Sequence, residues 1–290
     1  MPQANANGIE IEYVTEGDPS DPVLLLVMGL GAQLTTWPDE FVDGLRRRGF
    51  FVIRFDNRDS GLSTKLEGLP DVATLFTGTD LSSATYRIED MADDAAALLG
   101  ALGVAQAHVV GVSMGGMITQ AAVINHPELF ASAASIMSTT GDRAVGAPTG
   151  EAMTALLRPV ATSRDEAIQA SVEGSLVIGS PRYPTDEHIL RERAAAAYDR
   201  SYCPEGTARQ LGAILGSPDR TEGLHGVRIP FLVVHGEADP LVTPSGGDAT
   251  AAAVPGSKLL TFPGMGHDLP EALWGTITDA IVANTELAAV

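Results

Sequence analysis

The feature that most constrains this chain is the pentapeptide GVSMG at residues 111–115, because two different patterns meet there. Residues 107–112 form a short apolar run typical of a buried strand, and residues 114–125 have the spacing of a helix. A serine on such a sharp strand-to-helix turn adopts a strained backbone conformation. Side chains two residues away would collide there, which explains Gly111 and Gly115. The pattern predicts an exposed serine above the end of a strand.

The predicted helix begins directly after Ser113, which bears on what this serine can do. Backbone N–H groups at a helix N-terminus lack partners within the helix and carry partial positive charge, so the Met114 N–H can donate to an oxyanion formed beside Ser113. The five-residue pattern alone also occurs in ordinary turns. Because a strand precedes it and a helix follows it, the context favours a nucleophilic serine.

Strand and helix patterns alternate along most of the chain. We expect strands at residues 9–14, 23–28, 51–55, 107–112, 133–137, 231–235 and 258–262, and helices at residues 37–48, 88–102 and 114–125. This alternation predicts an α/β fold with a mostly parallel central sheet flanked by helices on both faces. In the helix at residues 88–102, we expect Asp90, Asp93 and Asp94 to form a solvated face.

Residues 140–226 have a different pattern, without strand signals. Helical stretches are expected at residues 151–157, 186–198 and 207–215. We therefore predict an inserted helical lid at residues 140–226, on an α/β core made of residues 1–139 and 227–290.

A glycine-rich loop, Gly29-Leu30-Gly31, directly follows the apolar run at residues 23–28. A dinucleotide site would need a third glycine at position 34, where this chain has Leu34, so no nucleotide cofactor is expected. A flexible loop at this place can instead turn the Leu30 N–H towards the serine as a second oxyanion donor. The polar loop at residues 56–61 is expected to tie down its own turn.

Two further reactive side chains, Asp239 and His267, stand just beyond predicted strand ends. Loops at the carboxyl ends of parallel strands converge on one crevice, so we expect both side chains to meet Ser113 there. The order Ser, Asp, His is a known chain order of a catalytic triad. Glu237 is the alternative acid. A metal cluster of His235, Glu237 and Asp239 lacks a recognised spacing, so no metal is expected.

The chain resembles the α/β-hydrolase family over nearly its whole length, through five segments in the expected order: VLLLVMGLG, FVIRFDNRDSGLS, HVVGVSMGG, FLVVHGEADP and PGMGHD. Within that family it is most similar to the lidded serine esterases typified by aclacinomycin methylesterase, through its VMG turn, WPDEF helix start and RDSGLS loop. The resemblance implies that Ser113 is the nucleophile, His267 the base and Asp239 its orienting acid. It also implies that the Leu30 and Met114 amides form the oxyanion hole.

These observations predict a carboxylic ester hydrolase that works through an acyl-enzyme on a hydrophobic or aromatic ester, including a methyl ester. Two alternatives keep the same triad: a cofactor-free perhydrolase or haloperoxidase, and a lactone hydrolase. A third alternative is a ligand-binding receptor with little turnover. The methionines near the motifs fit either an adaptable apolar pocket or an ordinary core, and they are Met28, Met114, Met137 and Met265.

The net charge, the apolar runs and the cysteine content limit the kinds of partner and environment that we expect for this chain. The 290 residues include 37 acidic and 18 basic side chains, and this net charge of −19 disfavours nucleic acids and anionic membrane surfaces. The longest apolar run, residues 23–30, is too short to span a bilayer, and the N-terminus lacks the pattern of a signal peptide. We expect a cytoplasmic protein that acts on a small-molecule ester. Cys203 is the sole cysteine, so an internal disulfide is excluded.

Overall fold

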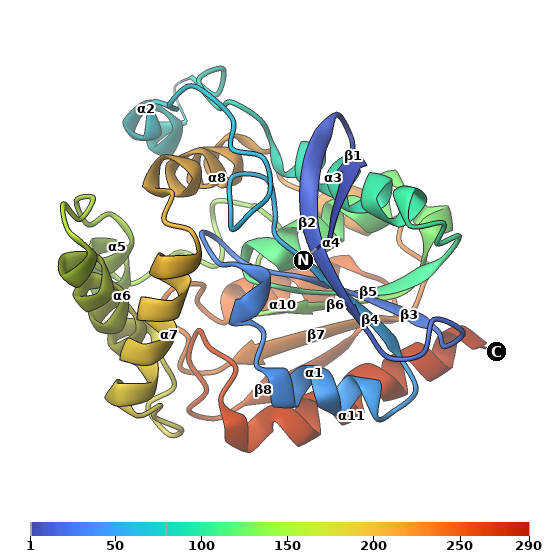
Figure 1. Ribbon diagram of the computed structural model, residues 1–290. Helices are drawn as coiled ribbons and strands as arrows, with labels where there is room; N and C mark the ends of the chain where they lie inside the picture. Colours follow the sequence, from blue (N-terminus) through green and yellow to red (C-terminus); the bar gives the residue numbers. More distant parts are fainter. Residues whose placement is uncertain (1, 79, 290) are drawn as a thin grey trace.

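The computed structural model describes residues 2–78 and 80–289, and at its centre these residues form an eight-stranded sheet (Figure 1). The strands are β1 (Gln3–Ala6), β2 (Ile9–Glu16), β3 (Val23–Val27), β4 (Phe51–Phe55), β5 (Ala107–Val112), β6 (Phe130–Ile136), β7 (Phe231–Gly236) and β8 (Lys258–Phe262). Their order is β1-β2-β4-β3-β5-β6-β7-β8. Only the β1–β2 and β2–β4 pairings among them are antiparallel, so the prediction of a mostly parallel sheet is confirmed.

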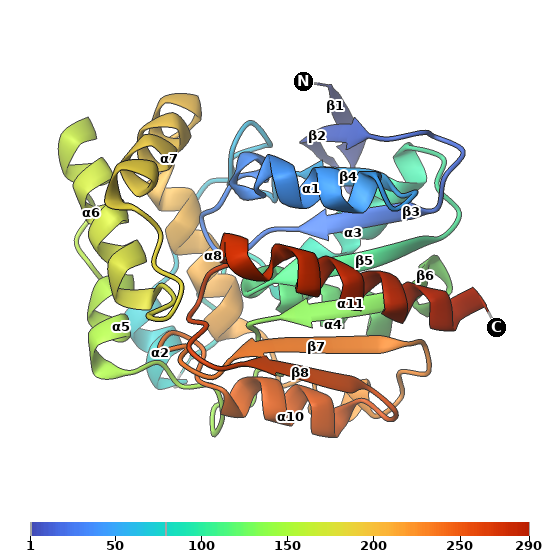
Figure 2. The ribbon, with the colours of Figure 1, turned by 90° about the horizontal axis from the view of Figure 1, so that it is seen from below.

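Helices cover both faces of the sheet. They are α1 (Asp39–Arg46), α3 (Ile88–Ala101), α4 (Met114–Asn125), α10 (Ser245–Ala253) and α11 (Trp274–Glu286). Helix α2 (Val72–Thr77) lies away from the sheet (Figure 1). Short 3₁₀ turns occur at Leu34–Thr36, Pro127–Leu129, Glu271–Leu273 and Leu287–Ala289. Figure 2 shows α1 and α11 together on one face, with α3 and α4 on the opposite face.

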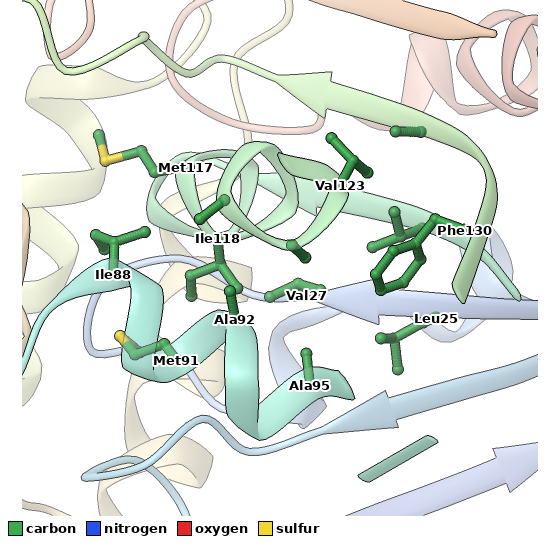
Figure 3. Close-up of a cluster of buried hydrophobic side chains, with 14 of the residues drawn as sticks. Leu25, Val27, Ile88, Met91, Ala92, Ala95, Met117, Ile118, Val123 and Phe130 are labelled. Carbon is green, nitrogen blue, oxygen red and sulfur yellow. The ribbon is translucent and has the colours of Figure 1, made fainter. Parts of the chain in front are cut away.

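The central strand β3 explains why its sequence is a continuous apolar run. Leu25 and Val27 pack towards α3 and α4 in the cluster shown in Figure 3, whereas Leu24 and Leu26 pack on the opposite face with α1 and α11. Successive side chains on a strand point to opposite faces, so a strand covered on both sides needs apolar residues throughout. Burial of each such leucine contributes roughly 1.5–3 kcal/mol to the stability of the fold.

The register of the strands brings several strand ends to one edge of the sheet. Val27 of β3 pairs with Gly111 of β5, and Ile136 of β6 pairs with both Val112 of β5 and Val234 of β7. The loops after β3, β5, β6 and β7 therefore leave the sheet side by side. Any chemistry carried by these loops is concentrated at this edge.

One prediction about α3 is wrong. Asp94 is buried and accepts hydrogen bonds from Nε and Nη2 of Arg58, each at 2.6 Å. The helical spacing places Asp94 on the same side of the helix as Asp90 and Asp93. It does not reveal that Arg58, on the loop after β4, contacts this side chain. Because a buried carboxylate needs such a partner, Asp94 belongs to an internal ion pair rather than to a solvated face.

Residues 140–226 lie between β6 and β7 and contain α5 (Gly150–Leu156), α6 (Arg164–Ile178), α7 (Glu187–Arg200), α8 (Pro204–Gly216) and α9 (Thr221–Leu224). We call them the inserted segment. Helices α5, α6 and α7 lie together beyond the carboxyl ends of the parallel strands (Figures 1 and 2). Helix α8 contacts α2, and α9 contacts α4 and α10. Among the helices of the described residues, none combines the length and the apolar composition of a membrane-spanning segment.

Candidate active site

Ser113 is the single residue between the end of β5 and the start of α4, and its backbone has φ 57° and ψ −120°. This positive φ is uncommon for a residue with a side chain and signals local strain. Hydrogen bonds on both sides hold the turn: Ser113 N–H donates to Ile136 O at 2.9 Å, and Ser138 Oγ donates to Ser113 O at 2.8 Å. The strained conformation is therefore held by the backbone of β6 on one side and by the Ser138 side chain on the other.

Glycines around Ser113 let three backbone segments approach one another. A Cβ added at Gly111 would lie 2.0 Å from Gly115 O, and one added at Gly115 would lie 2.1 Å from Val27 O. A Cβ added at Gly29 would lie 3.2 Å from the Ser113 Cβ. The start of α4 thus packs directly on β5 and on the end of β3, which brings the loop after β3 against Ser113.

Asp239 and His267 reach Ser113 from the loops after β7 and β8. His267 Nε2 lies 2.9 Å from Ser113 Oγ, and His267 Nδ1 lies 2.7 Å from Asp239 Oδ2. Asp239 is 2% exposed, and its Oδ1 accepts the N–H groups of Leu241 and Val242, each at 2.9 Å. These amides orient the carboxylate, which in turn favours the histidine tautomer that carries its proton on Nδ1. In that tautomer Nε2 is free to accept the serine proton.

Among the described residues, Glu237, the alternative acid, forms a hydrogen bond with neither Ser113 nor His267. Its Oε1 instead accepts a hydrogen bond from Thr261 Oγ1 at 3.0 Å on the surface. His235 is buried, with Nε2 2.8 Å from Val242 O and 3.6 Å from Asp239 Oδ2. Burial lowers the pKa of His235, which keeps it neutral. In residues 2–78 and 80–289, no three His, Cys, Asp or Glu side chains are grouped as metal ligands.

The Leu30 amide lies on the loop after β3, whose backbone is held by two hydrogen bonds. Asn57 Nδ2 donates to Met28 O at 2.9 Å, and Ala32 N–H donates to Gly29 O at 3.2 Å, so the loop is held at two points. Within the described part of the chain, neither Leu30 N–H nor Met114 N–H donates to an acceptor. Two unpaired N–H groups beside a serine side chain are suited to bind a negative charge that develops there.

The inserted segment also holds the histidine loop, which the sequence does not predict. His267 N–H donates to Ile178 O at 2.7 Å, and Gly266 N–H donates to Ser180 Oγ at 2.9 Å. Ser180 Oγ in turn donates to Asp268. Burial raises the pKa of Asp268, against the opposing effect of this hydrogen bond. The position of Asp268 directly after His267 is the one sequence signal that points to this contact.

The polar loop at residues 56–61 does tie down its own turn, since Asp56 accepts the Leu34 and Leu62 N–H groups at 2.7 and 2.8 Å. It also anchors the inserted segment. Arg200 Nη2 lies 2.8 Å from Asp56 Oδ2, and Arg209 Nη2 lies 2.8 Å from Asp59 Oδ1. The prediction is therefore correct but incomplete, because both arginines lie more than a hundred positions away in sequence.

The four methionines near the motifs are buried, and the structure supports the alternative that they are ordinary core residues. Met114 belongs to the cluster beneath α3 and α4, and Met28, Met137 and Met265 belong to the cluster on the other face of the sheet. As whole residues Ser113, His267 and Leu30 are half-buried, whereas the side chain of His267 is only 7% exposed.

Comparison with known proteins places this geometry in context. Residues 22–173 match the family profile described as alpha/beta hydrolase fold, and residues 210–277 match that of the TAP-like proteins. The chain is 29% identical to rhodomycin D methylesterase DauP of Streptomyces sp. (strain C5), over 94% of each chain. It is 27% identical to 3-oxoadipate enol-lactonase 2 of Acinetobacter baylyi, over 83% of this chain and 80% of the lactonase.

Among solved structures, the enol-lactonase of Burkholderia xenovorans LB400 superimposes with a TM-score of 0.76 and 23% identity. The match covers 98% of this chain and all of the lactonase, 100%. At this level of identity the likeness concerns the fold alone.

Proposed function

Because this chain belongs to the α/β-hydrolase fold family, we propose that it is a serine hydrolase that cleaves carboxylic esters. One observation carries the proposal: Asp239, His267 and Ser113 form a continuous line, with separations of 2.7 and 2.9 Å. Such a line lets a histidine activate a serine while a carboxylate orients the histidine. The 29% identity to a methylesterase supports an ester as the substrate.

In the first half of the reaction, His267 Nε2 takes the proton of Ser113 Oγ while Oγ bonds to the ester carbonyl carbon. The carbonyl oxygen becomes an oxyanion, which the Leu30 and Met114 N–H groups stabilise. Asp239 stabilises the imidazolium. His267 then donates its proton to the alkoxy oxygen as the C–O bond breaks, which releases the alcohol and leaves an acyl-enzyme.

In the second half, water attacks the acyl carbon while His267 Nε2 takes a proton from the water. The same two amides stabilise the second oxyanion. The bond to Ser113 Oγ breaks, His267 returns the proton to the serine, and a carboxylic acid leaves. All proton transfers use groups of this chain, so the reaction requires neither a cofactor nor a metal.

We propose a hydrophobic or aromatic ester, including a methyl ester, as the substrate class. The support is the relationship to rhodomycin D methylesterase over 94% of the chain. We also propose that residues 140–226 act as a lid on a core of residues 1–139 and 227–290. The position of α5, α6 and α7 beyond the strand ends that carry the triad loops supports this division.

A lactone is the second candidate substrate, and the 27% identity to an enol-lactonase favours it. A lactone is a cyclic ester, so the same steps apply, except that the leaving alkoxide stays tethered to the acyl group. Parallel assays with aryl acetates, methyl esters of aromatic acids and five-membered lactones distinguish the two classes by their kcat/KM values.

The decisive experiment compares hydrolysis of a p-nitrophenyl ester series by the wild type and by Ser113→Ala. We expect turnover to fall by more than about 10³-fold in the variant. Ser132→Ala removes a buried serine on β6 and should retain activity. Equal activity in Ser113→Ala would refute the assignment. Peroxide-dependent halogenation without ester turnover would indicate a perhydrolase, and tight binding without any turnover would indicate a receptor.

A further inference from the structure

We propose that Gln210 is a positioning residue for the oxyanion hole, acting through the backbone of Gly31; this inference rests on the proposed serine hydrolase function. Gln210 lies on α8 in the inserted segment, and its side chain is 0% exposed. Gly31 N–H donates to Gln210 Oε1 at 2.7 Å, and Gln210 Nε2 donates to Arg58 O at 2.8 Å. One amide thus bridges the loops after β3 and β4.

Only one orientation of the Gln210 amide satisfies both neighbours. Gly31 presents an N–H donor and requires the amide oxygen, whereas Arg58 presents a carbonyl and requires the amide nitrogen. Rotation of the amide by 180° would place its nitrogen, a donor, against the Gly31 N–H and its oxygen, an acceptor, against the Arg58 carbonyl. The side chain is therefore locked, and it offers Gly31 a fixed acceptor.

This acceptor controls a turn that can otherwise change its shape. Ala32 N–H donates to Gly29 O at 3.2 Å, so residues 29–32 form a turn with Leu30 and Gly31 at its centre. Gly31 has φ +66°, the sign that a type II turn requires at its third residue. Type I and type II turns differ by a flip of the central peptide group. Gln210 Oε1 favours the form in which the Gly31 N–H points towards α8.

The turn also contacts α8 at a second point. A Cβ added at Gly31 would lie 3.0 Å from Thr207 Oγ1, so α8 packs closely against the backbone of the turn. Two residues further along, α8 is anchored as well, because Arg209 donates to both oxygens of Asp59 at 2.8 and 2.9 Å. Helix α8 is therefore a fixed support beneath the loop after β3.

The consequence for catalysis concerns the Leu30 N–H, which belongs to the peptide group just before the locked one. A rigid turn holds this N–H in one direction, so no reorganisation is needed when the oxyanion forms. Without the Gln210 acceptor, the Gly31 N–H loses the partner that fixes the direction of its peptide group, so the turn is free to rearrange. Because the Leu30 N–H acts on the transition state, kcat should fall while KM stays nearly constant.

The test uses Gln210→Met, which keeps the length of the side chain but has no N–H donor and replaces the amide oxygen by a thioether sulfur, a much weaker acceptor. Gln33→Met is the matched control, because Gln33 is another buried glutamine that joins the loop after β3 to the inserted segment. Gln33 Nε2 donates to Ala197 O and Ser201 O at 2.7 and 2.9 Å, and Oε1 accepts from Arg200 at 2.6 Å. Both variants lose bridging hydrogen bonds, but only one of them loses the Gly31 acceptor.

We expect kcat of Gln210→Met for a p-nitrophenyl ester to fall roughly tenfold to a hundredfold, with KM within about twofold of the wild type. Affinity for an arylboronic acid, which forms a tetrahedral adduct on the serine, should fall by a similar factor. Gln33→Met should unfold at lower urea concentration yet keep kcat within about threefold. If Gln210→Met does not fold, Gln210→Asn, one methylene shorter, replaces it with the same expected direction.

Two results would overturn the inference alone: a folded Gln210→Met with unchanged kcat and boronate affinity, or an equal loss of kcat in Gln33→Met. A wild type that neither hydrolyses esters nor binds the boronate would overturn the proposed function and this inference together. The wild-type assays therefore separate the two failures.

Discussion

Ser113 Oγ lies 2.9 Å from His267 Nε2, although the two residues are 154 positions apart and follow strands that are not neighbours in the sheet. Two strands, β6 and β7, lie between β5 and β8. The contact forms because the loop after β8 extends back across these strand ends and is held there by the C-terminal end of α6, through the bond between His267 N–H and Ile178 O. The inserted segment therefore helps to place the histidine.

Substitution of Asp239 tests the orienting carboxylate. In Asp239→Asn, the amide can donate to His267 Nδ1 and so stabilises the tautomer that cannot accept the serine proton on Nε2. We expect kcat for a p-nitrophenyl ester to fall by about 10³–10⁴-fold, with a small change in KM. Glu237→Gln alters a surface carboxylate nearby and serves as the control. A comparable loss in the control would contradict a specific role for Asp239, and a loss in Glu237→Gln alone would assign that role to Glu237.

A second prediction concerns the glycine at the start of α4. In Gly115→Ala, the new Cβ would lie 2.1 Å from Val27 O, so β3 and α4 must move apart. We expect a loss of about 1–3 kcal/mol in the free energy of unfolding, measured by urea denaturation, together with reduced esterase activity. Gly100→Ala is the matched control, because no atom lies within 4 Å of its new Cβ on α3. That variant should gain roughly 0.5–1 kcal/mol.

The buried ion pair between Arg58 and Asp94 gives a third prediction. Their side chains are only 8% and 2% exposed, so Asp94→Ala leaves an uncompensated charge inside the protein. We expect the free energy of unfolding to fall by roughly 3–5 kcal/mol. Asp43→Ala breaks an exposed pair with Arg46 and should change it by less than about 1 kcal/mol. Equal losses in the two variants would show that the buried pair stabilises the fold no more than the exposed pair does.

Local patterns predict the centre of this molecule well. The bounds of β4, β5, α4 and β8 are the predicted ones, because each is set by a continuous apolar run or by a turn within a few residues of it. The loop positions of Asp239 and His267 follow from the same strand ends. The carboxyl ends of parallel strands lie at one edge, so their approach to Ser113 could be predicted without any knowledge of the helices.

Side chains whose roles depend on distant partners could not be predicted. Gln210 carries no signal in its own helix, since its acceptor function depends on Gly31, 179 positions away. Ser180 meets Asp268 across 88 positions. Asp94 shows the same limit in the opposite direction: its helical spacing suggests a solvated carboxylate, and only the folded loop supplies Arg58. Helical periodicity identifies which residues share a face, but not what that face contacts.

The last prediction concerns pH. Burial lowers the pKa of His108 below its ordinary value of 6.5, so the folded state binds a proton there more weakly than the unfolded state does. Acidification below about pH 6.5 should therefore lower the free energy of unfolding, by at most about 1.4 kcal/mol per pH unit for this group. The loss should continue until the pH passes below the pKa of His108 in the folded protein.

His108→Asn removes this titration, so its free energy of unfolding should fall less than that of the wild type between pH 7.5 and 5.5 in urea denaturation. His235, whose pKa is also lowered by burial, remains in the variant, so part of the pH dependence persists. Burial raises the pKa values of Asp94 and Asp268, which acts in the opposite direction in both proteins and cancels from the difference. Parallel pH profiles would mean that His108 binds protons equally well in the folded and unfolded states.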